Sequence, residues 1–289
     1  MTVIGVGLVG GSLARAMKDR GLVDEVVGVG RGEANLKRAV EMGVIDEFTH
    51  DPAEGVRGAT LVVLATPVGT FEPIAREIRP HLQAEAIVTD VGSVKGGVVH
   101  ALEDLLEGSA AFVGSHPIAG GEKSGVEASD PSIFDGARCV LTPTPQTRGF
   151  AIDRVEALWQ AVGCRTVRLD PDVHDKIFAA VSHLPHAVAF ALVAAVERMD
   201  GGLDLKNFSG GGYRDATRIG ASPADVWRDI FLLNREHTAS ALRVFEEEIA
   251  AIRREIEEGR GEELEARLSR ISQVRRALPN TERKAGSEK

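Results

Sequence analysis

The chain has 289 residues, of which 43% are hydrophobic and 27% charged, a balance typical of a soluble globular protein rather than a disordered or fibrous one. Its formal net charge of −9 argues against a nucleic acid or an anionic membrane as partner, because both favour a basic surface. The charge does not argue against a small anionic substrate, since a few arginines can bind one inside an acidic protein.

The two cysteines, Cys139 and Cys164, do not have the spacing of a metal site, and we expect no metal. Their scarcity is typical of a reducing cytoplasm, where cysteines remain free thiols. We expect no signal peptide, and we find no apolar run of the roughly 18 residues needed to cross a bilayer. These features together predict a cytoplasmic protein.

The first part of the chain alternates short apolar runs with amphipathic segments. In chain order we expect strand 2–6, helix 8–19, strand 26–29, helix 33–42, strand 61–65, helix 71–78, strand 86–89, helix 94–106, strands 111–113 and 139–142, helix 152–162 and strand 166–169. Strands that alternate with helices of about ten residues indicate an α/β fold with a doubly wound, Rossmann-type parallel sheet. We assign this dinucleotide-binding domain to residues 1–169.

The pattern changes at Asp170-Pro171, after which almost every segment is helical, so residues 170–289 predict an all-α domain. We expect helices over 174–199, 224–258 and 261–276, followed by a frayed C-terminal tail. The run 187–196 is apolar on nearly all sides and needs burial. We expect a second subunit to bury it, giving a homodimer through the helical domain; burial within one subunit is the alternative.

Gly5, Gly7 and Gly10 form the pattern G-x-G-x-x-G, with Leu8 and Val9 between the last two, at the end of a strand and the start of a helix. The first glycine allows a tight turn, the second lets the backbone approach a pyrophosphate, and the third permits close packing of helix on strand. Because this motif opens the first of several βαβ units, it predicts dinucleotide binding.

The choice of cofactor is read at the end of the second strand, where an acidic residue would favour NAD. This chain has Gly30-Arg31 there, which favours NADP with the Arg31 guanidinium on the 2′-phosphate. Alternatively, Arg31 stacks on the adenine or faces solvent. Thr66-Pro67 and Val91-Gly92 follow the next two strands, at the edge where doubly wound sheets bind ligands.

The segment Gly114–Gly125 places His116 in what we expect to be a Gly-rich loop after a Rossmann strand. The chain resembles the prephenate/arogenate (cyclohexadienyl) dehydrogenase family in this segment and in four other places along its length. These motifs are Gly5–Ser12, Asp90–Lys95, Ser115–Gly125, Ser182–Ala189 and Gly210–Trp227.

The resemblance implies NAD(P)-dependent oxidation and decarboxylation of prephenate or arogenate on the route to tyrosine. His116 is similar to the family's catalytic histidine, which takes the proton of the substrate hydroxyl, and Ser93 to a serine that hydrogen-bonds this hydroxyl. Arg218 resembles an arginine that pairs with the ring carboxylate. The other residues implied at the substrate pocket are His186, the gating carboxylate Glu122, its neighbour Gly121, and Asp215.

Several points stay open at this stage. His183 lies one helical turn before His186 and could exchange roles with it. No residue decides between prephenate and arogenate. A β-hydroxyacid-type dehydrogenase would need a catalytic lysine on the first long helix of the second domain, where Lys176 is the only lysine. A non-catalytic NADP-sensing protein would not need Ser93, His116 and Arg218 together.

Overall fold

The computed structural model of the chain describes residues 1–121 and 123–278. The chain divides into two compact units, Met1–Thr238 and Ala239–Lys289. All the described residues of the candidate site belong to the first unit.

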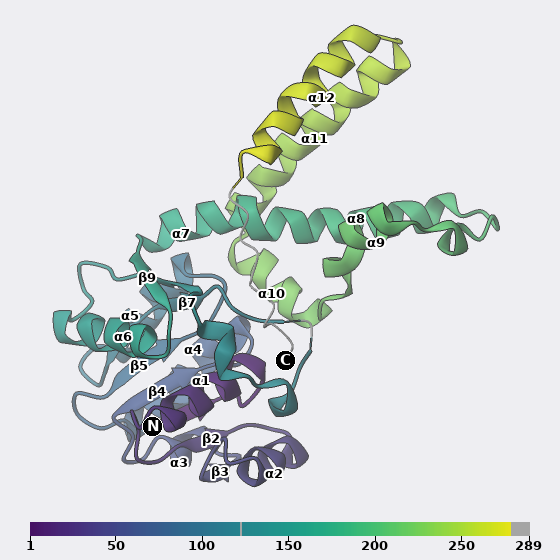
Figure 1. The fold of residues 1–289 in the computed structure, drawn as a ribbon. Coiled ribbons are helices and arrows are strands. Elements are labelled where there is room, and N and C mark those ends of the chain that lie inside the picture. The colour runs from purple at the N-terminus through teal and green to yellow at the C-terminus, as the bar shows by residue number, and fades with distance from the viewer. Residues whose placement is uncertain (122, 279–289) are drawn as a thin grey trace. The chain divides into compact units, whose positions relative to one another are not determined.

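The first unit contains a six-stranded parallel sheet in the order β3-β2-β1-β4-β5-β6 (Figure 1). Its strands are β1 (Thr2–Ile4), β2 (Val27–Val29), β3 (Glu47–Thr49), β4 (Leu61–Leu64), β5 (Ile87–Asp90) and β6 (Ala111–Val113). The strand order reverses between β1 and β4, which pair directly. This order is that of a Rossmann fold and confirms the predicted fold class.

Helices cover both faces of this sheet. They are α1 (Leu8–Asp19), α2 (Glu33–Glu41), α3 (Pro52–Gly55), α4 (Phe71–Ile78), α5 (Gly96–Leu106) and α6 (Gly149–Ala161). Successive strand residues point to opposite faces, so Val3 and Val63 join one buried cluster while Ile4 and Leu64 join the other. The first cluster contains residues of α1, α2 and α6, and the second contains residues of α4 and α5.

A separate three-stranded sheet contains β7 (Ser115–Pro117), β8 (Arg138–Leu141) and β9 (Arg165–Arg168). β7 runs antiparallel to β8, and β9 runs parallel to it. The last two strands predicted from the sequence therefore lie outside the main sheet. The prediction of a loop around His116 was also wrong, because His116 pairs with Val140 as the middle residue of β7. Pro117 suits this edge strand, since an edge needs fewer N–H donors.

Beyond residue 169 the described elements are helical. The helix expected over 174–199 consists of α7 (Pro171–Phe178), a π-helical turn (Ala179–His183) and α8 (Leu184–Met199). α9 (Gly211–Thr217), a 3-10 turn (Arg218–Ala221) and α10 (Ala224–Leu233) follow. The helix expected over 224–258 is interrupted at Asn234, whose buried side chain donates to the Asp175 carbonyl at 2.8 Å. This tertiary contact explains the break.

The segment Pro171–Met199 is long and apolar enough to cross a membrane by length and composition alone, a test that a core helix of a soluble protein can also pass. Within α8, Ala189 is the only buried residue of the single chain. Val181 in the preceding π turn is 66% exposed and Val193 39% exposed. The run expected to need burial is therefore largely uncovered in one subunit, and an uncovered apolar surface of this kind also occurs at subunit interfaces.

The second unit contains most of α11 (Arg235–Glu257), which begins in the first unit, and α12 (Gly261–Arg276). Arg267 joins the two helices, because its guanidinium donates to Glu255 Oε1 at 2.9 Å and to Glu248 Oε2 at 3.0 Å. Residues 279–289, most of the expected C-terminal tail, lie outside the described residues.

Candidate active site

The turn between β1 and α1 contains three glycines, and a side chain at the first or the third would collide with neighbouring atoms of the protein. Gly5 has a φ of +105°, and a Cβ there would lie 2.5 Å from the carbonyl carbon of Ala65. A Cβ at Gly10 would lie 2.2 Å from the Gly5 oxygen, so any side chain would push α1 off the sheet. A Cβ at Gly7, by contrast, would meet no atom within 4 Å. The first and third glycines allow close packing, and the second faces open space.

Open space beside a helix N-terminus is what a phosphate needs. Gly7 is the N-cap residue of α1, with no side-chain cap, and the first turn of α1 has no acidic residue. The first N–H groups of α1 therefore remain available to an anion, and the helix dipole favours negative charge there. Leu8 and Val9, in this first turn, are partly buried. The residues present fit a dinucleotide pyrophosphate.

Three further groups expected at the cofactor lie around this edge of the sheet. Thr66-Pro67 and Val91-Gly92 follow β4 and β5, which pair with each other. Arg31 follows β2 and is exposed. The nearby Glu33 carboxylate pairs with Lys37 at 2.8 Å, and this hydrogen bond lowers the pKa of Glu33.

A buried ion pair that sequence reasoning did not single out lies below the Val91–Val94 loop. Lys95 Nζ donates to Asp90 Oδ2 at 2.5 Å and to the Gly92 carbonyl at 2.8 Å, and both charged side chains are 0% exposed. Gly92 N also donates to Asp90 Oδ2 at 2.8 Å. The pair thus holds the loop that carries Ser93, whose side chain is partly buried.

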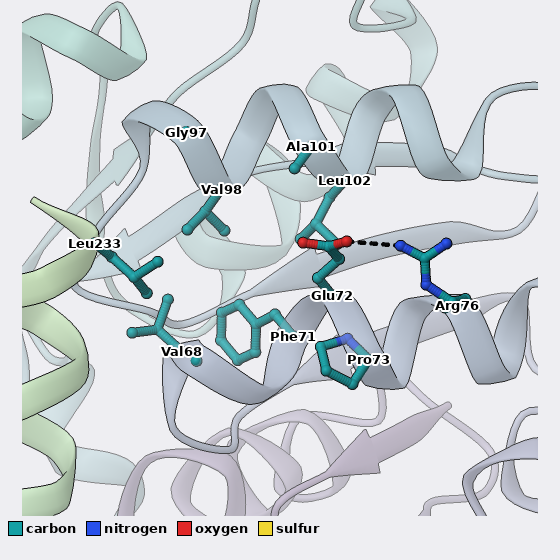
Figure 2. Close-up of a pocket in the computed structure, with 11 residues that line it drawn as sticks. Val68, Phe71, Glu72, Pro73, Arg76, Gly97, Val98, Ala101, Leu102 and Leu233 are labelled. Atoms are coloured by element: carbon teal, nitrogen blue, oxygen red, sulfur yellow. Dashed lines mark hydrogen bonds and ion pairs between the residues drawn. The ribbon is translucent and has the colours of Figure 1, made fainter.

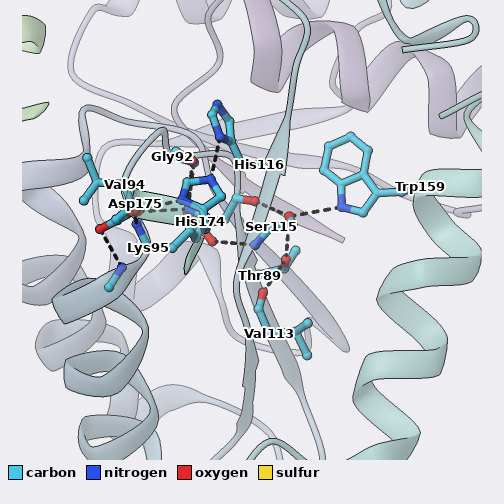
Figure 3. A network of polar contacts seen from close by, with 12 residues as sticks. Thr89, Gly92, Val94, Lys95, Val113, Ser115, His116, Trp159, His174 and Asp175 are labelled. Atoms are coloured by element: carbon cyan, nitrogen blue, oxygen red, sulfur yellow. Dashed lines mark hydrogen bonds and ion pairs between the residues drawn. The ribbon is translucent and has the colours of Figure 1, made fainter. Parts of the chain in front are cut away.

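The same carboxylate fixes β7. Asp90 Oδ1 accepts from Ser115 N at 3.0 Å, while Ser115 Oγ donates to the Asp90 carbonyl. Trp159 Nε1 donates to Ser115 Oγ at 3.0 Å, and the Thr89 hydroxyl lies 3.1 Å from it (Figure 3). Ser115 is therefore held from three sides, and it fixes the backbone position of the next residue, His116.

His116 is 9% exposed, and its Nδ1 lies 2.9 Å from Nε2 of His174 on α7. Burial lowers the pKa of His116 well below its usual value, and electrostatic interactions with His174, Lys95 and His183 lower it further. The lowered pKa favours the neutral imidazole, which has one nitrogen with a free lone pair. The catalytic role that the resemblance implies for His116 stays a prediction.

His174 and the adjacent Asp175 are residues that sequence reasoning missed. His174 is 0% exposed, and its Nδ1 lies 2.8 Å from Asp175 Oδ1. Asp175 also accepts from the backbone N–H groups of Lys95 at 2.7 Å and Gly96 at 2.8 Å, and so caps α5 (Figure 3). The only sequence signal was a His-Asp pair in the first turns of the helical half.

The two histidines considered for the pocket have different surroundings. His183 is 0% exposed, its Nδ1 lies 3.1 Å from Asn234 Nδ2, and burial lowers its pKa to about 4. His186 is partly exposed and stacks on Trp227, with ring centroids 3.5 Å apart and planes 20° apart. His186 is therefore the more accessible of the two histidines.

Arg218 follows α9, is exposed, and begins the 3-10 turn that packs on α8. It lies close enough to His186 to affect the pKa of that residue, which burial lowers most, while the Ser182 carbonyl raises it and Arg218 lowers it. Asp215 is exposed on α9. The structure thus brings Arg218 and His186 together.

Gly121 is exposed, and a Cβ there would meet only Leu8, at 3.6 Å. Glu122, the expected gating carboxylate, lies outside the described residues. The described part of the chain contains no group of His, Cys, Asp and Glu side chains placed to hold a metal. Both cysteines are buried free thiols, and burial raises the pKa of Cys164 to about 12.

A groove of about 550 Å³ opens elsewhere in the first unit, between α4 and α5 (Figure 2). Phe71, Val98 and Leu233 are among its lining residues, and the Glu72–Arg76 ion pair lies at one side. None of the residues expected at the active site lines this groove.

The two halves of the chain match two family models in succession. Residues 13–168 match the nucleotide-binding domain of prephenate dehydrogenase, and residues 170–270 match its dimerization domain. The chain is 34% identical to a prephenate dehydrogenase of Bacillus subtilis over 95% of this chain and 75% of that protein. It is 32% identical to a cyclohexadienyl dehydrogenase of Zymomonas mobilis over 96% of this chain and 95% of that protein.

Solved structures of related enzymes are similar to this chain over nearly its whole length. Prephenate dehydrogenase from Aquifex aeolicus, crystallised with hydroxyphenyl propionate and NAD+, is 39% identical, with a TM-score of 0.89 and coverage of 95% of this chain and 96% of that chain. Arogenate dehydrogenase of Synechocystis is 29% identical, with a TM-score of 0.78 and coverage of 95% and 98%. Together with the buried histidine and the glycine-lined turn, these matches show that the chain belongs to the prephenate dehydrogenase family.

Proposed function

We propose that this chain oxidises and decarboxylates prephenate to 4-hydroxyphenylpyruvate, or arogenate to tyrosine, with transfer of hydride to NAD or NADP in tyrosine biosynthesis. The observation that carries the proposal is His116, a buried neutral imidazole in the same unit as a glycine-lined turn that fits a dinucleotide. The related prephenate, cyclohexadienyl and arogenate dehydrogenases support the substrate class.

The cofactor would lie along Gly5, Gly7, Leu8, Val9 and Gly10, with its pyrophosphate at the N-terminus of α1. Its nicotinamide supplies the acceptor for the hydride that leaves the substrate carbon bearing the hydroxyl. The backbone at Thr66-Pro67 and Val91-Gly92 then forms the edge of the sheet against which the cofactor is held.

The side chains of the protein handle the proton and the carboxylate. His116 takes the hydroxyl proton as the carbon is oxidised, and Ser93 hydrogen-bonds the same oxygen. Cleavage of the bond to the ring carboxylate releases CO2, and its electron pair makes the ring aromatic, so that the carbonyl oxygen becomes a phenolate and takes back a proton. Arg218 orients that carboxylate through two parallel hydrogen bonds. His186, Asp215, Gly121 and Glu122 complete the proposed substrate pocket.

We infer a preference for NADP from Arg31. Among the described residues, the exposed Arg31 guanidinium makes no hydrogen bond or ion pair, and the carboxylate of Glu33, two residues further along the chain, is paired with Lys37. Replacing Arg31 by Ala should therefore lower kcat/KM for NADP more than for NAD. An equal loss with both cofactors, or a wild-type preference for NAD, contradicts this inference.

We further propose a cytoplasmic homodimer that forms through residues 170–289, with residues 1–169 as the nucleotide-binding half. The uncovered apolar residues of α8 and the match to a dimerization domain support this arrangement. A small-molecule substrate is the partner we expect, and no nucleic acid or membrane. Sedimentation of the purified chain as a monomer at micromolar concentration would contradict the homodimer.

The direct test is an assay of prephenate and L-arogenate, each with NAD and with NADP. We expect reduction of the nicotinamide and release of CO2 with at least one pair, and the best pair identifies the substrate and cofactor. Absence of turnover with all four pairs would contradict the function. The alternative dehydrogenase class has no support in the site, since Lys176, its required lysine, is exposed on α7.

A further inference from the structure

We propose that His174 and Asp175 are positioning residues that hold His116 in the tautomer with the proton on Nδ1, so that Nε2 is the atom that accepts the substrate proton. The geometry that points to this is a continuous line of three side chains, His116, His174 and Asp175 (Figure 3). The inference takes its catalytic meaning from the proposed function.

The line starts at the Asp175 carboxylate, which accepts at both oxygens. The N–H groups of Lys95 and Gly96 donate to it at 2.7 and 2.8 Å, and a backbone N–H can only donate. A Cβ at Gly96 would lie 2.8 Å from Asp175 Oδ2, so the carboxylate is tightly fitted against this backbone. With backbone donors on both oxygens, the carboxylate is used as an acceptor, and His174 Nδ1 has to donate to it.

The protonation of His174 then determines that of His116. Burial is the largest cause of the lowered pKa of His174, which favours its neutral form. A neutral ring with the proton on Nδ1 has a lone pair on Nε2. His116 Nδ1 lies 2.9 Å from that atom and therefore carries the proton it donates. Its own Nε2 is left with the lone pair, as a general base requires.

Packing keeps water away from this line. Phe178 lies against both rings, with centroid distances of 4.7 Å to His116 and 4.4 Å to His174. A hydrogen bond that is shielded from water is stronger than one in water. If either histidine had the other tautomer, two lone pairs or two N–H groups would face each other between the rings. The surroundings therefore penalise the alternative arrangement.

The ionisable groups around His116 come from four elements, and none of them supplies a competing acceptor for its Nδ1 in the described part of the chain. The segment from β5 to α5 contributes the Asp90–Lys95 pair, α7 contributes His174 and Asp175, and the π turn contributes His183. β8 contributes the buried thiol of Cys139.

The tautomer can be observed directly in the full-length chain. The sequence contains 8 histidines, so a spectrum of 15N-histidine-labelled protein is simple enough to assign, and His116→Asn identifies the His116 signals by their loss. At pH 7 we expect a protonated Nδ1 and an unprotonated Nε2. A proton on Nε2 of His116, or on both nitrogens, would overturn the proposal whatever the kinetics show.

Kinetics of His174 variants test the consequence. His174→Leu removes the acceptor and should lower kcat by about 10²- to 10⁴-fold, the range of a general base, while the Kd for NAD(P)+ changes little. His174→Gln, whose amide oxygen can accept from Nδ1, should retain more activity and more of the Nδ1–H tautomer. His100→Gln, an exposed histidine on α5, is the matched control and should match the unmodified chain.

Unchanged kcat in His174→Leu would overturn the proposal, as would equal losses in the Leu and Gln variants with an unchanged tautomer. These outcomes differ from a failure of the proposed function, because that failure shows as an unmodified chain without turnover. The tautomer measurement on the unmodified chain needs no substrate and stands in either case.

Discussion

Lys95→Met provides the sharpest test of how the loop carrying Ser93 is held. The substitution keeps the length of the side chain but removes the cation from a pair in which both side chains are 0% exposed. Asp90 would keep its hydrogen bonds from Gly92 N and Ser115 N and lose its counter-charge. Breaking a buried pair by removing one partner typically costs about 3–5 kcal/mol, because an uncompensated charge stays buried.

This cost converts to a large thermal shift. For a unit of this size, each kcal/mol corresponds to a change of about 2–4 °C in Tm, so the unit that contains the sheet should unfold roughly 6–20 °C lower. Scanning calorimetry at pH 7 measures this. The double variant Lys95→Met/Asp90→Asn should regain at least about 1 kcal/mol, because it leaves no unpaired charge. A Tm within 2 °C, or a double variant no better than the single, would refute the reasoning.

Three further predictions concern the site. His116→Asn should lower kcat by about 10²- to 10⁴-fold and leave the Kd for NAD(P)+ unchanged, since it removes only the base; unchanged turnover would exclude that role. Arg218→Ala should raise the substrate KM by about 10- to 100-fold with a smaller effect on kcat, because a charge-assisted hydrogen bond contributes about 1.5–3 kcal/mol; a wild-type KM would count against the pairing. His183 has a pKa of about 4 in the folded chain, against 6.5 ordinarily, so the unfolded state takes up a proton first as the pH falls. Stability should decrease from pH 6.5 down to about 4, by at most about 3 kcal/mol from this residue. Urea unfolding at several pH values should show a weaker dependence in His183→Gln, and an equal dependence would contradict this account.

Local signals predicted the nucleotide-binding half well. The helices expected over 8–19 and 71–78 have the observed bounds, because amphipathic spacing and glycine turns act over a few residues. β3 and β7 were missed because neither is an apolar run: β3 has the sequence Glu-Phe-Thr, and β7 has the sequence Ser-His-Pro. The break at Asn234 was missed because it depends on a contact with Asp175, far away in the sequence.

Only the site residues that lie in recognisable sequence motifs could be predicted. The glycines, and His116 through its resemblance to a family, could be named from neighbouring residues. The hydrogen bond between His116 and His174 joins positions 58 apart in the sequence, and no periodicity indicates it. The Asp90–Lys95 pair lies within one recognised motif, but its complete burial is a property of the folded sheet.

Because Asp175 caps α5, the position of the junction matters in chimeras made from related enzymes. The family models meet between residues 168 and 170, which invites a chimera joined there. In such a chimera, His116 and the start of α5 would come from one parent. His174, which accepts from His116, and Asp175, which caps α5, would come from the other. If the junction lay after α7, beyond Phe178, all of these interdependent groups would come from the same parent protein.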